Sequence, residues 1–148
     1  MDKWYLCTVS YERQADNMGL HKVSESYLVD ALSFTEAEER VIKEVTPLVS
    51  FGALEVANIR PMRLSELLLD ERGSGKYYRA RVGFIEINQA TGQERAVNTA
   101  MVVQADTLKE AVAKLADYLD EGRTSYEIVG IAELDILDVY RYIAPEEQ

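Results

Sequence analysis

The sequence has 148 residues, of which 47% are hydrophobic and 28% are charged. This is the composition of an ordinary globular chain, so it excludes a wholly disordered protein and a fibrous one. The 26 acidic residues outnumber the 16 basic residues and give a net charge of −10, which disfavours non-specific binding to nucleic acid or to an anionic membrane surface.

The chain opens with two predicted strands. Apolar residues alternate along residues 3–11, so that every second side chain lies on one face of a strand. A second alternation runs through residues 23–29. Residues 12–22, between them, are rich in charged residues and contain Asn and Gly, which is typical of a hairpin loop.

A helix and a third strand follow. Ser33-x-x-Glu36 is a capping box, in which two side chains bond to backbone N–H groups at the start of a helix. The apolar stripe that follows at helical spacing consists of Phe34, Ala37, Val41, Val45 and Leu48. The third strand is expected to be long, from residue 54 to about residue 68, with a bend at Pro61, and it could cross between the two halves of the chain.

The second half of the chain repeats the first at offsets of 72 to 74 residues. Strands are predicted at residues 76–84 and 97–103, a second capping box at Thr107-x-x-Glu110, and another long strand from residue 126 to about residue 142. The charge divides evenly as well, because each half of 74 residues carries 13 acidic and 8 basic residues. The chain is therefore predicted to be an internal repeat.

The repeat predicts an α+β fold made of a tandem ββαβ motif, with mainly antiparallel sheet and one helix per repeat. Because the helix joins two parallel strands, we expect a right-handed crossover and the strand order 2-1-3. The expected domains are a first repeat at residues 1–71, a linker at 72–75 and a second repeat at 76–148. Units of about 70 residues are marginally stable alone, so we expect them to pack together around a pseudo-twofold axis.

No pattern of catalytic, cofactor-binding or metal-binding residues is found. Residues 73–76 lack the first glycine of a P-loop, and Lys76 opens a strand instead of a helix. His21 lies in the predicted hairpin loop with no nucleophile at a known spacing, and Cys7 lies on the predicted core face, where a thiol is inert. With one cysteine and one histidine, an intrachain disulfide and a Cys/His zinc site are excluded. The chain is predicted not to be an enzyme and to use no cofactor.

The outer face of the predicted sheets, opposite the helices, is the candidate ligand or partner face. An aromatic residue followed by two arginines on an open sheet can stack a base or clamp a phosphate, whereas the simpler interpretation is that this face packs on the other repeat or on a second chain. Arg60 and Arg63 flank Pro61 and either extend this face or mark a surface bend. The candidate residues are Trp4, Leu6, Tyr77, Arg79, Arg81, Arg60 and Arg63.

Three segments carry a resemblance to a family. These are Lys3-Trp4-Tyr5, the run YLVDALSFTEAE at residues 27–38 and the ending Asp138-Val139-Tyr140. They resemble an uncharacterised family of small proteins encoded by Bacteroidetes and by their phages and mobile elements. The resemblance implies an intracellular α+β protein and carries over no catalytic residue.

The leading hypothesis is a non-enzymatic binding or accessory protein that acts through protein–protein contacts, as a homo-oligomer or with another protein, with a relation to phages or mobile elements. The alternative is binding of single-stranded nucleic acid or a nucleotide on the aromatic and arginine face, which the net charge disfavours. A small enzyme of unknown reaction is the third hypothesis. No secretory signal and no apolar run of membrane-spanning length are seen, so a cytoplasmic protein is expected.

Overall fold

The computed structural model describes residues 3–14 and 19–141 of the chain. The chain forms two compact units: unit 1 comprises Met1–Met62 with Ile136–Gln148, and unit 2 comprises Arg63–Asp135. Each unit contains one four-stranded sheet and one α-helix, which confirms the α+β class. Each sheet is mixed, because it combines antiparallel pairs with one parallel pair.

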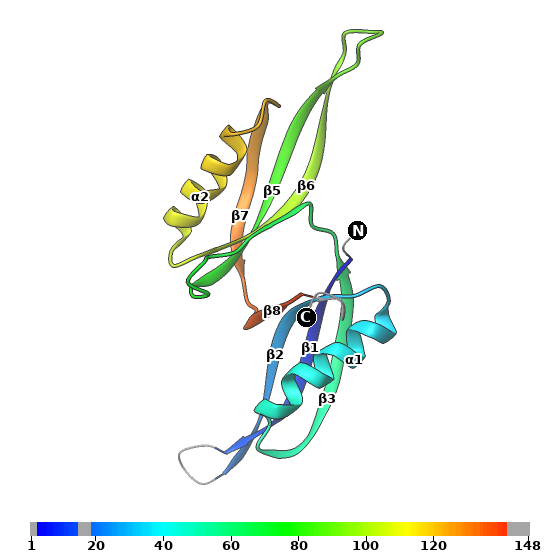
Figure 1. Ribbon diagram of the computed structural model, residues 1–148, viewed down its shortest axis with the longest axis vertical. Helices are drawn as coiled ribbons and strands as arrows, with labels where there is room; N and C mark the ends of the chain where they lie inside the picture. The colour runs from blue at the N-terminus through cyan, green and yellow to red at the C-terminus, as the bar shows by residue number, and fades with distance from the viewer. Residues whose placement is uncertain (1–2, 15–18, 142–148) are drawn as a thin grey trace. The chain divides into compact units, whose positions relative to one another are not determined.

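Unit 1 has its sheet strands in the order β3-β1-β2-β8, with α1 across one face (Figure 1). Its elements are β1 (Trp4–Gln14), β2 (Leu20–Asp30), α1 (Phe34–Val45), a 3₁₀ turn (Thr46–Leu48), β3 (Phe51–Met62) and β8 (Asp138–Tyr140). The central strand β1 pairs antiparallel with both β2 and β3, and β8 adds to β2 in parallel. The expected strand order 2-1-3 is therefore present in this sheet.

The core of unit 1 lies between α1 and the sheet. Alternate residues of β1 face the helix, and Cys7 and Val9 are completely buried there. Three residues of α1, at spacings of four, complete the core: Ala37, Val41 and Val45. The helix begins at the expected place, because the backbone N–H of Glu36 donates to Ser33 Oγ at 3.1 Å, which satisfies one N–H that the helix itself leaves unpaired.

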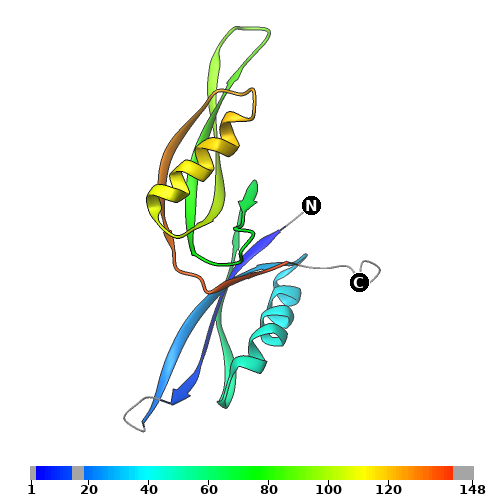
Figure 2. The same cartoon turned by 60° about the vertical axis from the view of Figure 1, so that its left-hand side comes forward.

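Unit 2 has the strand order β4-β6-β5-β7, with α2 along one face (Figure 2). Its elements are β4 (Glu66–Leu68), β5 (Lys76–Ile87), β6 (Glu94–Ala105), α2 (Leu108–Asp120) and β7 (Tyr126–Leu134). The core again lies between helix and sheet, where Ala80 and Val82 of β5 meet Ala111 and Leu115 of α2. Thr107 caps α2 by accepting the Glu110 backbone N–H at 3.1 Å.

The long third strands were predicted wrongly. β3 ends at Met62, and three residues separate it from β4, which pairs in parallel with β6 of unit 2. In the same way β7 ends at Leu134, and the separate strand β8 pairs with β2 of unit 1. The chain therefore does cross between the units, once after β3 and once after β7, and the short strand that follows each crossing completes the edge of the sheet in the unit that the chain has entered.

The division of the chain also differs from the expected repeats at 1–71 and 76–148, because residues 63–71 belong to unit 2 and residues from 136 onward to unit 1. Residues 72–75, expected as the linker, lie inside unit 2 between β4 and β5. The first hairpin is longer than predicted, since β1 and β2 extend into the expected loop. Its tip, residues 15–18, and the expected strand end at residue 142 lie outside the described residues.

Burial makes the Cys7 thiol unreactive. The side chain is 0% exposed, and burial raises its pKa from 9.0 to about 11, which lowers the thiolate fraction at pH 8 by about 100-fold. We expect the folded protein to react with Ellman's reagent at pH 8 at least about 100-fold more slowly than the urea-unfolded chain. Equal rates for the folded and unfolded chains would contradict the buried position.

Candidate functional site

The aromatic and apolar residues of the candidate face are buried. Trp4 and Leu6 of β1 are 6% and 8% exposed, and Tyr77 of β5 is 7% exposed. Their side chains lie opposite the helix-facing rows of their strands, as predicted, but in this structure they are not accessible for stacking on a base. The two arginines that follow Tyr77 are exposed instead.

Arg79 and Arg81 point outward from the central strand of unit 2. They alternate with the buried residues Ala80 and Val82, so their side chains leave the sheet on the face away from α2. Three of their four neighbours across the sheet are small: Arg81 pairs with Ala100 of β6 and Gly130 of β7, and Arg79 pairs with Ala132 of β7 and with the larger Val102 of β6. Small neighbours leave open depressions on both sides of the arginine pair.

The depression on the β6 side is the candidate site, and we call it the arginine pocket. It has a volume of about 390 Å³. A second depression of about 510 Å³ lies on the β7 side of the same two arginines, and a side chain at Gly130 would find no atom within 4 Å. The arginine pocket is lined by Arg63, Leu64, Ser65, Arg79, Arg81, Asn98, Thr99 and Ala100.

The short strand β4 brings Arg63 to this pocket. The Ser65 backbone N–H donates to the Ala100 carbonyl oxygen at 2.9 Å, and Ser65 Oγ donates to the same oxygen at 3.3 Å. These bonds, together with the β4–β6 pairing, hold the segment before β4 against β6. Arg63, at the start of this segment, therefore lines the same depression as Arg79 and Arg81.

The arginine pocket is positively charged within an acidic protein. No Asp or Glu lines it or the depression on the β7 side. In the described part of the chain, none of Arg63, Arg79 and Arg81 has an ion pair within 4.0 Å, although Arg13, Arg72 and Arg95 do. Three unpaired guanidinium groups around one pocket repel one another, and an anion between them removes that repulsion.

Unit 1 shows that the fold does not require these arginines. At the same register, β1 has Leu6 and Thr8, where β5 has Arg79 and Arg81. The residue three positions before β8 is Asp135, whereas the residue three positions before β4 is Arg63. The arginines are therefore particular to unit 2.

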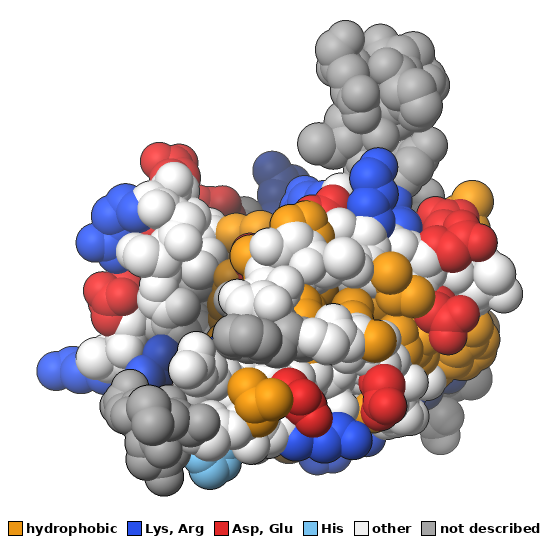
Figure 3. Space-filling view, turned by 90° about the horizontal axis from the view of Figure 1, so that it is seen from below, with side chains coloured by type: hydrophobic (Ala, Val, Ile, Leu, Met, Phe, Trp, Pro, Cys, Tyr) orange, Lys and Arg blue, Asp and Glu red, His pale blue; other side chains and the backbone are white. Residues whose placement is uncertain are grey.

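Arg60 is not among the residues that line the arginine pocket. It belongs to β3 of unit 1, where it pairs with Leu6 and is exposed. On the face drawn in Figure 3, acidic, basic and hydrophobic side chains are intermixed, and no basic area dominates.

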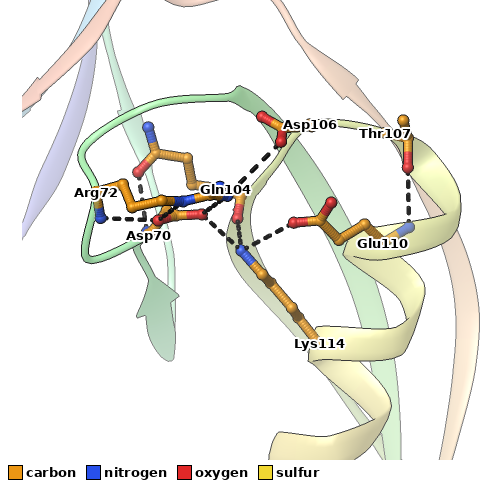
Figure 4. Close-up of polar contacts among 7 residues, drawn as sticks. All are labelled: Asp70, Arg72, Gln104, Asp106, Thr107, Glu110 and Lys114. Carbon is orange, nitrogen blue, oxygen red and sulfur yellow. Dashed lines mark hydrogen bonds and ion pairs between the residues drawn. The ribbon is translucent and has the colours of Figure 1, made fainter.

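A second cluster of charges, centred on Asp70, is structural (Figure 4). The Asp70 carboxylate accepts Arg72 Nη2 at 2.8 Å and Lys114 Nζ at 3.0 Å. Lys114 Nζ also donates to the Gln104 backbone carbonyl at 3.0 Å, and the Asp70 backbone N–H donates to Gln104 Oε1 at 3.0 Å. These hydrogen bonds connect the loop after β4 to α2 and β6. Arg72 is held by its bond to Asp70 and is not part of a flexible linker.

The remaining chemistry-bearing residues do not form a site. His21 is exposed on β2, and Cys7 is buried in the core of unit 1. Among residues 3–14 and 19–141, no three His, Cys, Asp or Glu side chains are grouped as metal ligands would be. No helix in this described part of the chain is long and apolar enough to cross a membrane.

The fold and the pocket thus define a two-unit α+β protein with an exposed arginine pocket on one unit. Residues 3–142 match the family described as "Domain of unknown function (DUF4494)", and the chain belongs to this family. The resemblance to an uncharacterised family is therefore confirmed. That this family is encoded by Bacteroidetes and their phages remains a prediction. The comparisons with curated proteins and with solved structures found no match.

Sequence reasoning identified the three arginines but missed several of the residues that shape the pocket around them. Ser65 and Thr99 are short polar residues in unremarkable surroundings, and nothing in the sequence marks them. The small residues beside the arginines, Gly130 and Ala132, could be found only by aligning β7 with β5. That alignment requires the bulge between Arg81 and Val82, where β7 has one extra residue.

Proposed function

We propose that this protein is a binding protein without catalytic activity, and that unit 2 receives an anionic group of a partner between Arg63, Arg79 and Arg81. The observation that carries the proposal is the pocket of three arginines with no lining carboxylate. A guanidinium group offers several N–H donors in a plane and pairs with both oxygens of a carboxylate or phosphate.

The polar residues of the pocket support recognition rather than catalysis. The side chains of Asn98 and Ser65 add donors and acceptors of moderate strength, and no His, Cys or carboxylate lines the pocket to act as an acid, base or nucleophile. The pocket is open, so a group carried on a large partner can reach it. A partner protein fits these features best.

The nucleic-acid alternative has less support. Binding of single strands without sequence preference uses aromatic side chains on which bases stack, but Tyr77, the aromatic residue of β5 on the same face as Arg79, is 7% exposed. The net charge of −10 also opposes a long polyanion. We therefore favour a carboxylate or phosphate group on a protein.

We also infer that the two units derive from one duplicated ββαβ motif. Both central strands pair with their neighbours in the same register, and both have a bulge at the same place, between Thr8 and Val9 in β1 and between Arg81 and Val82 in β5. On this proposal one copy acquired the arginines and the other did not. A pseudo-twofold arrangement, a homo-oligomer and a role in phages or mobile elements stay predictions.

Charge reversal tests the arginine pocket. Inorganic pyrophosphate, titrated calorimetrically at low salt, should bind with a Kd on the order of 0.1–1 mM, and the double variant Arg79→Glu/Arg81→Glu should bind at least about 10-fold more weakly because it repels the anion. The control Lys109→Glu/Arg123→Glu makes the same change in charge at two exposed residues of unit 2 outside the pocket. Absence of binding by the wild type, or equal losses in both double variants, would overturn the proposal.

A further inference from the structure

Within the described residues, part of one edge of β6 beside the arginine pocket has no strand partner. β6 spans Glu94–Ala105 and pairs with β5 along its whole length. On its other edge, β4 pairs only with Met101–Val103. In the described part of the chain, no strand pairs with residues 94–99 on this side.

The backbone groups on this free edge can be assigned. The Ala100 carbonyl points away from β5, because it accepts the Ser65 N–H. Backbone groups of a strand point to alternate sides with a period of two residues, so the N–H and C=O groups of Asn98 and Ala96 also point away from β5. The groups of Val97 point toward β5. The edge thus offers donors and acceptors at two-residue spacing, which is the pattern that an extended peptide backbone complements.

The free edge and the arginine pocket are continuous. Asn98, Thr99 and Ala100 belong to β6 and also line the pocket with Arg79 and Arg81. The side chains of Ala96 and Asn98 lie on the same face of the sheet as that of Ala100, which pairs with Arg81. A strand added along residues 94–99 would therefore place every second side chain on the arginine face.

The part of the edge at residues 96–99 has none of the features that prevent such pairing. Natural sheet edges are commonly protected by charged side chains, by proline, by a bulge or by a covering segment. Glu94 and Arg95 are charged, but residues 96–99 contain no charged residue and no proline, and β6 has no register shift against β5.

We propose that unit 2 binds an extended acidic segment of a partner protein as an added β-strand along residues 94–99 of β6, with alternate acidic side chains of that segment in the arginine pocket. This inference rests on the proposed function and adds the chemical class of the ligand. Main-chain hydrogen bonds to Ala96 and Asn98 supply affinity. The arginines select an acidic sequence, because they are unpaired and no carboxylate lines the pocket.

The test uses a fluorescein-labelled hexapeptide of alternating Glu and Val, with the matching Gln and Val peptide as control. Fluorescence anisotropy at low salt should show binding of the Glu peptide by the full-length protein, and at least about 10-fold weaker binding of the Gln peptide. Asn98→Pro removes an N–H that faces the free edge and no bond to β5, so it should weaken peptide binding at least about 10-fold. The matched control Asn98→Ala loses the same side-chain amide but keeps the N–H, so it should bind the peptide at least about 3-fold more tightly than Asn98→Pro does.

Hydrogen exchange in the wild type gives a readout that does not depend on the folding of the proline variant. Addition of the Glu peptide should slow exchange of the Ala96 and Asn98 amides at least about 10-fold and leave Val97 unchanged, because Val97 already faces β5. No added protection at Ala96 and Asn98 would overturn strand addition.

The two proposals fail in different ways. If Asn98→Pro folds and binds the peptide like the wild type while Arg79→Glu/Arg81→Glu abolishes pyrophosphate binding, strand addition is wrong and the arginine pocket stands. If pyrophosphate does not bind at all, the proposed function itself fails. Tighter binding of a six-residue oligo-dT than of the Glu peptide, lost only in the arginine variant, would replace the peptide with single-stranded nucleic acid.

Discussion

Leu115→Ala should lower the free energy of unfolding of unit 2 by about 2–5 kcal/mol. Leu115 is 0% exposed and lies at the centre of the core between α2 and the sheet. Its removal leaves a cavity that rigid neighbours on β5 and β6 cannot fill, so the loss includes both the burial of the side chain and the packing around it. Urea unfolding followed by far-UV circular dichroism measures the change.

The matched control is Leu108→Ala, the same substitution on the same helix. Leu108 is 48% exposed, so its loss should cost less than about 1 kcal/mol. Amide exchange in β5 and β6 assigns the effect of Leu115→Ala to unit 2. The core assignment would be wrong if the two leucine variants were destabilised equally.

Asp70→Asn should lower the melting temperature of unit 2 by several degrees. The substitution keeps the shape of the side chain but removes the charge that pairs with both Arg72 and Lys114. The Asp70 side chain is only 7% exposed, so water replaces these partners poorly. Differential scanning calorimetry of the two proteins gives the difference directly.

The effect of Asp70 on stability should also depend on pH. Hydrogen bonds from Arg72, first of all, and from Lys114 hold the pKa of the Asp70 carboxyl well below its usual range. A carboxyl group with a lowered folded pKa stabilises the fold fully above its unfolded pKa of about 4, and this contribution is lost as the pH falls from there through the folded pKa. The difference in melting temperature between wild type and Asp70→Asn should be constant above about pH 5 and should shrink below about pH 4.

Asp106→Asn is the control for the Asp70 network. It makes the same chemical change at a carboxylate that is 54% exposed and lies 3.6 Å from Arg72. Exposed ion pairs contribute little, so the melting temperature should change by about a degree or less. A loss as large as that of Asp70→Asn would show that the Asp70 contacts are not the source of the stability.

The sequence predicted those parts of the fold that local patterns specify. The alternation in β1 and β5, the caps at Ser33 and Thr107 and the helical spacing of the buried residues of α1 depend on residues within a few positions of one another. The failures involve contacts between distant segments. β4 has three residues and pairs with β6 about 35 positions away, and neither its length nor its composition distinguishes it from a continuation of β3.

The candidate site could also be predicted only in part, because some of its features follow from local alternation and others depend on contacts between distant segments. Alternation along β5 placed Arg79 and Arg81 on the outer face, because the period of a strand requires it. The exposure of Arg79 and the burial of Tyr77, two positions apart on that face, could not be predicted. Both depend on which other segments cover each end of the sheet.

By itself the sequence determined the α+β class, the order of hairpin, helix and strand in each half, and the position of two arginines on the outer face of β5. These follow from side-chain periodicity and helix capping, which act over short stretches of chain. Only the tertiary structure decided that β4 adds to β6 and β8 to β2, that Arg63 lines the same pocket as Arg79 and Arg81, and that residues 94–99 of β6 have no strand partner on one edge in the described part of the chain. These outcomes depend on hydrogen bonds between backbone segments far apart in the chain, and backbone groups carry no information about sequence.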